Sequence, residues 1–164
     1  METKRCFLHT FQESDESEVK ELYRDQEVRK YLGGVRKGAS IEETLRAMYH
    51  SGENSFYWVV REKQTGSFMG LVSLDSHHES IFPEVSYQFS PEWWGQGVAT
   101  EVVQEVVNTA LYGRKVTKIV EETQIANKAS CRLLEKVGMS VERRVKRFGA
   151  EQAIYSREAI KRDD

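Results

Sequence analysis

The segment GQGVAT, from Gly95 to Thr100, has the residue types of an anion-binding turn. It lies directly before a long amphipathic stretch, so its backbone N–H groups are those that a helix leaves without partners at its start. Unpaired amides and the positive end of the helix dipole together attract an anion. Glycine has no Cβ, which lets a bulky phosphate approach the backbone. The sequence therefore predicts either a pyrophosphate-binding turn or a plain helix start.

Two common nucleotide-binding motifs do not fit this segment. A Walker-type loop needs a lysine followed by Ser or Thr after its last glycine, and no lysine follows Gly97. A dinucleotide fingerprint needs a third glycine where Thr100 stands, within an N-terminal βαβ unit. The turn instead follows three predicted antiparallel strands, so both motifs are excluded.

A second group of polar residues lies at the start of a later predicted helix, NKASCRLLEKVG. Asn127 is a good N-cap residue, and helical spacing places Ser130 near the same face. Leu133, Leu134 and Val137 must face the core, so Ser130 also points inward. A buried hydroxyl needs a hydrogen-bond partner. We therefore expect Ser130 to contact another polar group, with a simple helix cap at Asn127 as the alternative.

The elements that must position these residues alternate between strand and helix patterns. Helix starts are predicted after Asp15, at a capping box of Ser40 and Glu43, at Gly97 and at Asn127. The valine-rich helix repeats its apolar pairs every four residues, which predicts one broad buried stripe. The predicted strands are 5–11, 55–63, 67–75, 84–90, 118–124 and a hairpin over 140–160; the predicted helices are 16–32, 41–50, 97–112 and 127–138.

Composition and charge describe a globular protein. Of 164 residues, 39% are hydrophobic and 30% charged, and the formal net charge of −2 argues against nucleic acid as a partner. Cys6 and Cys131 provide neither a disulfide framework nor a zinc site. The first residues lack an apolar signal core, and no apolar run reaches membrane length. We therefore expect one domain over residues 1–164, in the cytoplasm.

Several segments, in order along nearly the whole chain, resemble the GNAT superfamily of N-acetyltransferases, in the branch of ribosomal-protein-alanine N-acetyltransferases. They are RCFLHTFQESD, EVSYQFSPEWWG with the following QGVATE, NKASCRLLEKVGM and FGAEQAIYS. In the turn, Gly97 and Ala99 match the family pattern, whereas Trp94 stands where Gln or Arg is usual. Trp93 and Trp94 are otherwise expected to cap the core at a sheet edge. The resemblance implies an α/β (α+β) fold, with a mixed, mostly antiparallel sheet of about six to seven strands and about four flanking helices.

The same resemblance implies acetyl-CoA as the cosubstrate and direct transfer of its acetyl group to an amine, without a metal. The strand before the turn would carry a bulge and part from its neighbour, and the Phe89 N–H would face the thioester oxygen. Leu134 stands where many members have a tyrosine that acts as the general acid and protonates the departing thiolate. In the branch that this sequence resembles, a serine is proposed for that role, and Ser130 is at its position. The implied coenzyme contacts are Tyr87, Gln88, Phe89, Gly95, Gln96, Gly97, Val98, Ala99, Thr100, Asn127 and Ser130.

Three glutamates are candidate bases for the amine proton: Glu84, Glu122 and Glu151. None stands out from the sequence, a surface carboxylate is the alternative for each, and Glu84 is taken as the catalytic candidate. At pH 7, deprotonating a lysine side chain costs about 4.6 kcal/mol, against roughly 1.4 kcal/mol for an α-amine. A weak or water-relayed base would therefore favour an α-amine or another amine of low pKa.

We therefore expect an N-acetyltransferase that acts on a primary amine, either a protein N-terminus or a small molecule. The missing tyrosine keeps a non-catalytic acyl-CoA-binding module open, and a longer acyl-CoA is a further alternative. The acceptor is expected between the first two helices and the C-terminal hairpin, around 33–44 and 148–156. No metal is expected, because the adjacent His77 and His78 should diverge on a solvated loop. No membrane partner is expected, and a homodimer only by analogy.

Overall fold

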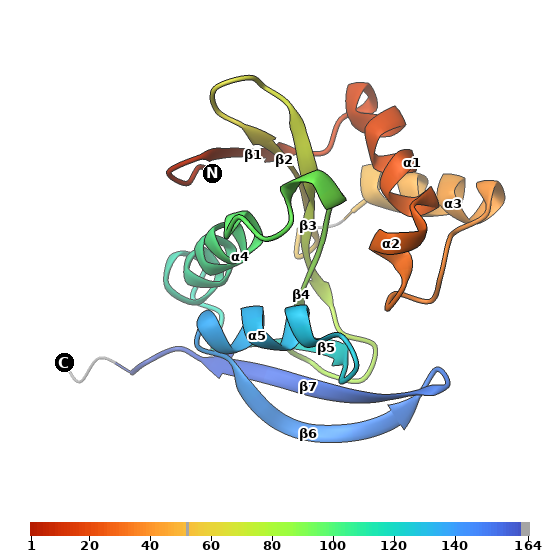
Figure 1. Cartoon of the computed structure of the whole chain (residues 1–164). Helices are drawn as coiled ribbons and strands as arrows, with labels where there is room; N and C mark the ends of the chain where they lie inside the picture. Colours follow the sequence, from red (N-terminus) through yellow and green to blue (C-terminus); the bar gives the residue numbers. More distant parts are fainter. Residues whose placement is uncertain (52, 162–164) are drawn as a thin grey trace.

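The computed structural model describes residues 1–51 and 53–161. Strands and helices follow one another in the predicted order, with one additional break (Figure 1). The elements are β1 (Cys6–Thr10), α1 (Glu16–Arg24), α2 (Gln26–Arg29), α3 (Gly38–Tyr49), β2 (Phe56–Glu62), β3 (Phe68–Ser76), β4 (Pro83–Phe89), α4 (Val98–Asn108), β5 (Lys118–Gln124), α5 (Lys128–Lys136), β6 (Ser140–Arg147) and β7 (Ala150–Glu158).

The strands form one seven-stranded sheet in the order β1-β2-β3-β4-β5-β7-β6. Every neighbouring pair is antiparallel except β4 and β5, which are parallel. The parallel pair needs a crossover connection, and α4 supplies it. The expected fold class, a mixed and mostly antiparallel sheet, is confirmed.

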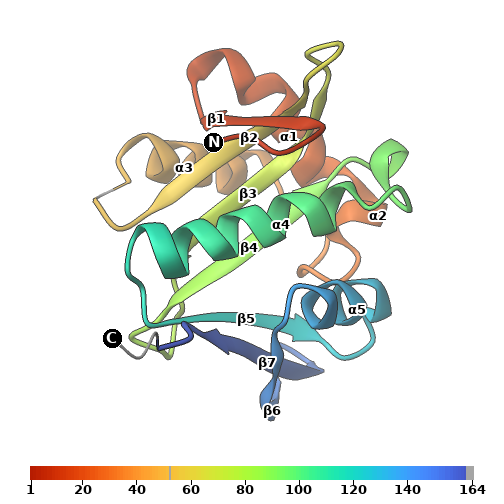
Figure 2. The same ribbon diagram turned by 90° about the vertical axis from the view of Figure 1, so that its left-hand side faces the viewer.

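Helices cover both faces of this sheet (Figure 2). Helices α4 and α5 pack on one face, over the larger core, and α1 to α3 pack on the other. The predicted stripe of α4 is buried, and the buried residues of that segment are Val98, Val102, Val103, Val106, Val107, Ala110 and Leu111. The two faces carry separate hydrophobic clusters, so a ligand that lies between β4 and β5 would be accessible from both faces of the sheet.

The first predicted helix, 16–32, is wrong as a single element. It breaks at Asp25, whose backbone is extended at φ −79° and ψ 121°. The Asp25 carboxylate accepts hydrogen bonds from the N–H groups of Glu27 and Val28 at 2.9 and 3.0 Å, and so caps a new helix, α2. An aspartate competes in this way for backbone donors and favours a cap over a helix interior. The break turns the chain toward the open end of β4.

The predicted capping box at Ser40 is also wrong. Helix α3 begins at Gly38, with Lys37 at the N-cap and no side-chain cap. Ser40 lies in the first turn, and its hydroxyl accepts hydrogen bonds from the Arg36 guanidinium, from Nε at 3.0 Å and from Nη2 at 2.6 Å. A nearby guanidinium has therefore replaced a backbone amide as the partner of this hydroxyl.

The helix predicted over 97–112 ends earlier as a regular α-helix. After Asn108 the chain makes a wider π turn, Thr109–Gly113, in which the Arg114 N–H donates to the Thr109 carbonyl at 2.9 Å. Across residues 1–51 and 53–161, no helix is long and apolar enough to cross a membrane.

Candidate active site

The central feature of the site is the place where β4 and β5 separate. They pair at one position, Glu84 with Val120, whereas β3 and β4 pair at seven consecutive positions. The ladder between β3 and β4 has no register shift along these described strands, so the expected bulge in β4 is absent. The expected parting of β4 from its neighbour is present. It leaves the β5-facing edge of β4 without a complete ladder.

The backbone groups that face this gap follow from the alternation of hydrogen bonds in an antiparallel pair. Just beyond β4, the Ser90 N–H donates to the Met69 carbonyl at 2.9 Å, so the adjacent residue, Phe89, points its backbone groups away from β3 and toward β5. By the same alternation, Tyr87 also faces the gap. The open edge of β4 therefore presents the N–H groups of Tyr87 and Phe89, two of the expected coenzyme contacts.

The two tryptophans hold this edge in place. The indole N–H of Trp94 donates to the Phe89 carbonyl at 2.8 Å, which leaves the Phe89 N–H as the available group. The indole of Trp93 donates to the Phe68 carbonyl at 3.1 Å and packs against the larger core. Trp93 thus caps the core as expected, whereas Trp94 is half exposed and anchors the end of β4.

The glycine turn is built to receive an anion. Gly95 and Gly97 have left-handed backbones, with φ of +72° and +76°, which L-residues adopt at a cost. Among the described residues, no backbone or side-chain group accepts a hydrogen bond from the six amides of Gly95 to Thr100. A Cβ at Gly95 would meet no atom within 4 Å. Exposed donors, open space and the start of α4 together fit a pyrophosphate.

An arginine that sequence reasoning missed supports this turn. Arg5, which precedes β1, donates from Nη1 to the Gln96 carbonyl at 2.8 Å, and its Nε pairs with Glu101 at 3.0 Å. Burial favours the neutral form of Glu101, but bonds from Thr3 and Arg5 outweigh it and hold the pKa of this carboxyl below its usual value. The pairing offsets a negative charge in the first turn of α4, where it would repel a phosphate.

Ser130 has the polar partner that its inward position demands. Its hydroxyl lies 2.5 Å from the Tyr87 hydroxyl, across the gap between α5 and β4. Asn127 caps α5 as predicted, accepting the Ser130 N–H at 3.2 Å. Burial raises the pKa of Tyr87 well above its usual value, so this phenol keeps its proton. A tyrosine hydroxyl is therefore close to Ser130 although Leu134 occupies the expected tyrosine position.

Glu84 lies where the two strands begin to part. Its Oε2 accepts the Glu122 N–H at 3.0 Å, so the carboxylate occupies a β5 donor that a continued ladder would use. Burial raises the pKa of the Glu84 carboxyl to about 7; the Glu122 amide opposes this rise, and the Glu122 charge adds to it. A carboxylate that titrates near neutrality suits a general base.

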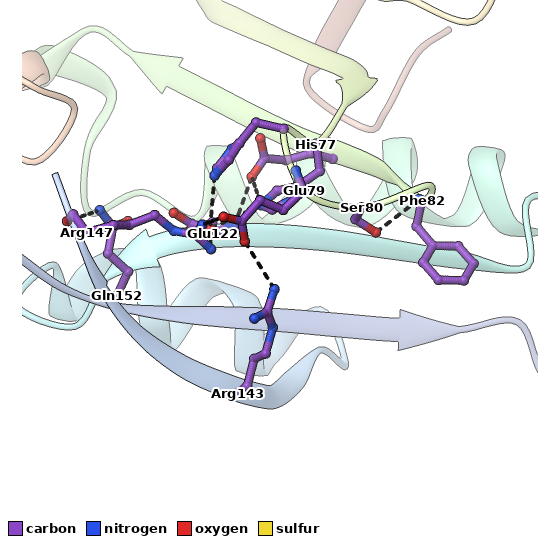
Figure 3. A network of polar contacts seen from close by, with 10 residues as sticks. His77, Glu79, Ser80, Phe82, Glu122, Arg143, Arg147 and Gln152 are labelled. Carbon is purple, nitrogen blue, oxygen red and sulfur yellow. Dashed lines mark hydrogen bonds and ion pairs between the residues drawn. The ribbon is translucent and has the colours of Figure 1, made fainter.

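The other two candidate bases are less suitable. The Glu122 carboxylate is almost completely buried, with His77 Nε2 at 3.1 Å and Arg147 Nη2 at 2.8 Å from one oxygen, as Figure 3 shows. The Arg147 contact is an ion pair without good hydrogen-bond alignment. Glu151 is exposed on the hairpin. Of the three, Glu84 alone is partly buried without an arginine or lysine in direct contact; the nearest ring nitrogen, His77 Nε2, lies 4.0 Å from its Oε2.

The expectation that His77 and His78 diverge on a solvated loop is wrong. His77 is buried, and the two imidazoles stack with their centroids 4.3 Å apart, because the chain turns sharply after β3. With Glu122 they bring three ligand-type atoms within 4.8 Å of one another. However, His77 Nδ1 accepts the Glu79 N–H at 3.1 Å, so Nε2 carries the hydrogen that faces Glu122. In this arrangement His77 is a donor to Glu122 rather than a metal ligand.

A further carboxyl group was missed by sequence reasoning. Glu121 lies on the β5 face that carries Ile119 and Thr123, and its side chain is buried with Oε2 lacking a hydrogen-bond partner among the described residues. Burial raises the pKa of Glu121 well above its usual value, with the charges of Glu84 and Glu122 adding to the effect. Strand alternation in KIVEETQ predicts a residue that faces a core, but it does not identify this buried acid.

Comparison with known proteins now gives this geometry a class. Residues 5–140 match the family model described as an acetyltransferase (GNAT) domain. The chain therefore belongs to the GNAT acetyltransferase family, whose members transfer an acetyl group from acetyl-CoA to an amine. The expectation of an acetyl-CoA-dependent enzyme is confirmed at the level of the family, which leaves the non-catalytic module without support.

Two relatives from Bacillus subtilis (strain 168) extend over most of the chain. The protein named YkkB is 24% identical over 163 residues, covering 96% of this chain and 94% of its own length. The N-acetyltransferase named YoaA is 26% identical over 150 residues, covering 87% and 83%.

Three solved structures share the fold. An acetyltransferase of the GNAT family from Bacillus anthracis has a TM-score of 0.83 at 20% identity, covering 97% of this chain and 98% of that one. A spermidine N-acetyltransferase from Vibrio cholerae, in complex with CoA and spermine, scores 0.80 at 16% identity, covering 94% and 95%. A ribosomal-protein-alanine acetyltransferase from Vibrio fischeri scores 0.75 at 16%, covering 97% and 96%.

Proposed function

We propose that this protein transfers the acetyl group of acetyl-CoA directly to a primary amine of low pKa. The observation that carries the proposal is the continuity of free backbone donors, from Tyr87 and Phe89 on β4 to the six amides of the glycine turn. A pantetheine arm and a pyrophosphate are connected in the same way in coenzyme A. The named activities of the structural neighbours, on spermidine and on a ribosomal protein, are also acetylations of amines.

Backbone groups hold and polarise the thioester. The Phe89 N–H lies at the end of β4, beside the glycine turn, and donates to the thioester oxygen as negative charge develops there. Asn127 lies at the start of α5, beside Ser130, and contacts the pantetheine arm. Because these donors are fixed by the sheet and by Trp94, they need little reorganisation when the amine attacks.

Glu84 receives the proton that the amine loses. Glu84 and Phe89 are five positions apart on β4, about 16 Å between their Cα atoms at roughly 3.3 Å per residue. The proton therefore travels through water rather than by direct contact. A carboxylate with a pKa of about 7 and a water relay form a weak base. This weakness favours an α-amine, whose pKa is near 8, over a lysine side chain.

Tyr87 and Ser130 supply a proton to the departing sulfur. Their hydroxyls form one hydrogen-bonded pair, so the oxygen nearer the sulfur can donate its proton while it takes the proton of the other, and solvent returns the proton that the pair loses. Burial keeps the phenol protonated. The pair stands in for the tyrosine that Leu134 replaces.

The proposed function is tested by ligand-dependent melting followed by thiol release. Acetyl-CoA at a hundred times its Kd is expected to stabilise the protein by about 2.7 kcal/mol. For a chain of this size, that is a rise in Tm of roughly 5–10 °C. ATP and NAD serve as controls, and a butyryl-CoA arm separates acetyl transfer from transfer of a longer chain. No shift with acetyl-CoA or CoA, or no thiol release with any primary amine, would overturn the proposal.

A further inference from the structure

The segment between α2 and α3, residues 30–37, lies across the acceptor side of the gap between β4 and β5. At its start, Arg29 Nη1 donates to the Gln88 side-chain oxygen on β4 at 3.2 Å. From the other strand, the Gln124 side chain of β5 donates to the Tyr31 carbonyl at 3.1 Å. The segment is thus tied to both strands on the face opposite α4 and α5. An amine that reaches the thioester from this face must pass beside it.

Two arginines border this segment without a carboxylate partner. Arg29 and Arg36 both lie over the Tyr23 ring, with guanidinium carbons 5.9 and 5.2 Å from its centroid. Arg29 donates to the carbonyls of Leu32 and Gly34, and Arg36 to Ser40. Within the described part of the chain, neither guanidinium has a carboxylate oxygen within 4.0 Å.

Two other half-buried arginines in the same molecule are paired with carboxylates, whereas Arg157 donates only to neutral acceptors, the Asn108 side chain and the Val137 carbonyl. Arg61 pairs with Asp15 and Glu18 at 2.8 and 2.6 Å, and Arg147 pairs with Glu122 at 2.8 Å. A guanidinium removed from water without an anion is costly. Burial lowers the pKa of Arg29, and the positive charge of Arg36 lowers it further. Two cations that repel each other on a partly buried surface would be stabilised by one shared anion.

The surroundings also favour an anion of planar, two-oxygen geometry. The Nη1 group of Arg36 has no described acceptor, and the forked donors of a guanidinium match a carboxylate. Arg36 lies two residues before α3, a helix of 12 residues that begins without a side-chain cap. Its first amides add a positive field at the same place.

We propose that the acceptor is an amine that carries a carboxylate, an amino acid or a peptide with a nearby free carboxyl group, and that Arg29 and Arg36 bind that carboxylate. The inference rests on the proposed function and names its substrate class. Because Arg29 contacts Gln88, the residue before Phe89, the bound carboxylate lies close to the position where the amine attacks. A polyamine, which is cationic throughout, would meet two unneutralised arginines here.

A matched series of amines tests the assignment. Wild-type protein is assayed by thiol release with α-, β- and γ-amino acids, with their amides, with short dipeptides and with spermidine. We expect kcat/KM for the best carboxylate acceptor, referred in each case to the concentration of unprotonated amine, to exceed that of its amide by about tenfold or more, the size of a charge-assisted contact. The Arg36→Gln variant should lose this preference through a higher KM for the carboxylate acceptor, and Arg36→Lys should recover part of it.

Controls separate this inference from the function on which it rests. Arg46→Gln removes the same charge from an exposed position of α3 and should change no acceptor preference. The Tm rise with acetyl-CoA should persist in every variant. If Arg36→Gln is poorly folded, the Arg29→Lys variant provides a second test of the preference for the carboxylate acceptor over its amide. An enzyme that acetylates amides or spermidine as well as carboxylate acceptors overturns the carboxylate site alone. Absence of thiol release with all amines overturns the proposed function itself.

Discussion

The two sides of the β4–β5 gap present different kinds of chemical group, mainly backbone amides on one side and charged side chains on the other. On the side of α4 and α5, main-chain amides and two hydroxyls form the site, in a short segment that begins at Tyr87 and ends at Thr100, with α5 added. On the side of α1 to α3, the candidate groups are charged side chains: Arg29 and Arg36 over the Tyr23 ring, and Glu84 farther along β4. A backbone site accepts one invariant ligand, whereas a side-chain site can change its acceptor by single substitutions.

The largest expected effect comes from the acceptor side. Glu84→Gln keeps the hydrogen bond to the Glu122 amide but cannot take a proton, so kcat should fall by about a hundredfold or more. Wild-type kcat/KM should rise with pH and show an inflection near 7, because only the ionised Glu84 is a base. The variant should lack that inflection and retain the one that belongs to the amine. Stopped assays of thiol release from pH 5.5 to 9 measure both profiles.

Coenzyme binding is the control for Glu84→Gln, because the coenzyme is expected on the other side of the gap. Acetyl-CoA binding by Glu84→Gln, followed by its Tm shift, should equal that of the wild type. An unchanged pH profile in the variant would remove Glu84 from the chemistry. If Glu84→Gln showed no Tm shift with acetyl-CoA, the acceptor side would also be needed for coenzyme binding, and the two sides would not act independently.

A smaller effect is expected from the coenzyme side. Gly97→Ala places a Cβ at the start of α4, where its nearest neighbour in the protein is the end of the Arg5 side chain at 3.6 Å. Acetyl-CoA affinity should fall about tenfold, about 1.4 kcal/mol. Gly66→Ala is the matched control, because Gly66 has φ of +74° and open space around its Cβ. Both variants should lose about 1–2 kcal/mol of stability from the left-handed backbone.

Isothermal titration and denaturant unfolding separate the two contributions. Equal acetyl-CoA affinity in the two glycine variants would show that the turn does not contact the ligand.

The smallest effect is expected at the hydroxyl pair. Tyr87→Phe and Ser130→Ala should each lower kcat a few-fold, because a thiol with a pKa near 8.5 leaves readily without strong acid help. The double variant should lose little more than either single variant, since the two hydroxyls act as a unit. Pre-steady-state thiol release measures the step directly. Additive losses would indicate that the residues act separately.

The same contrast explains what the sequence predicted. The glycine turn, the Asn127 cap and the valine stripe depend on neighbouring residues, and the structure has all three in the predicted places. The break at Asp25 and the role of Ser40 depend on competition between a local cap and a tertiary partner. A sequence pattern shows the possible local cap but not the tertiary partner, so it cannot predict which of the two interactions forms.

The sequence predicted the region of the acceptor side, which includes Arg36, but not its contacts, because the partners are far apart in the chain. Arg29 meets Gln88 across 59 positions, and His77 meets Glu122 across 45. The pKa of Glu84 depends on the burial that the sheet imposes, which no spacing in the sequence encodes. The sequence therefore offered three glutamates, with Glu84 taken as the candidate, and the raised pKa of Glu84 supports that choice.

The bond between Glu84 and the Glu122 amide has an evolutionary consequence. One carboxylate is both the proposed base and the acceptor of a β5 donor at the point where the strands part. An apolar replacement would remove the base and release that amide to β4, so the chain would lose turnover and the coenzyme slot together. A lineage that drifts from enzyme to coenzyme sensor would therefore pass through glutamine at this position, which preserves the opening while ending the chemistry.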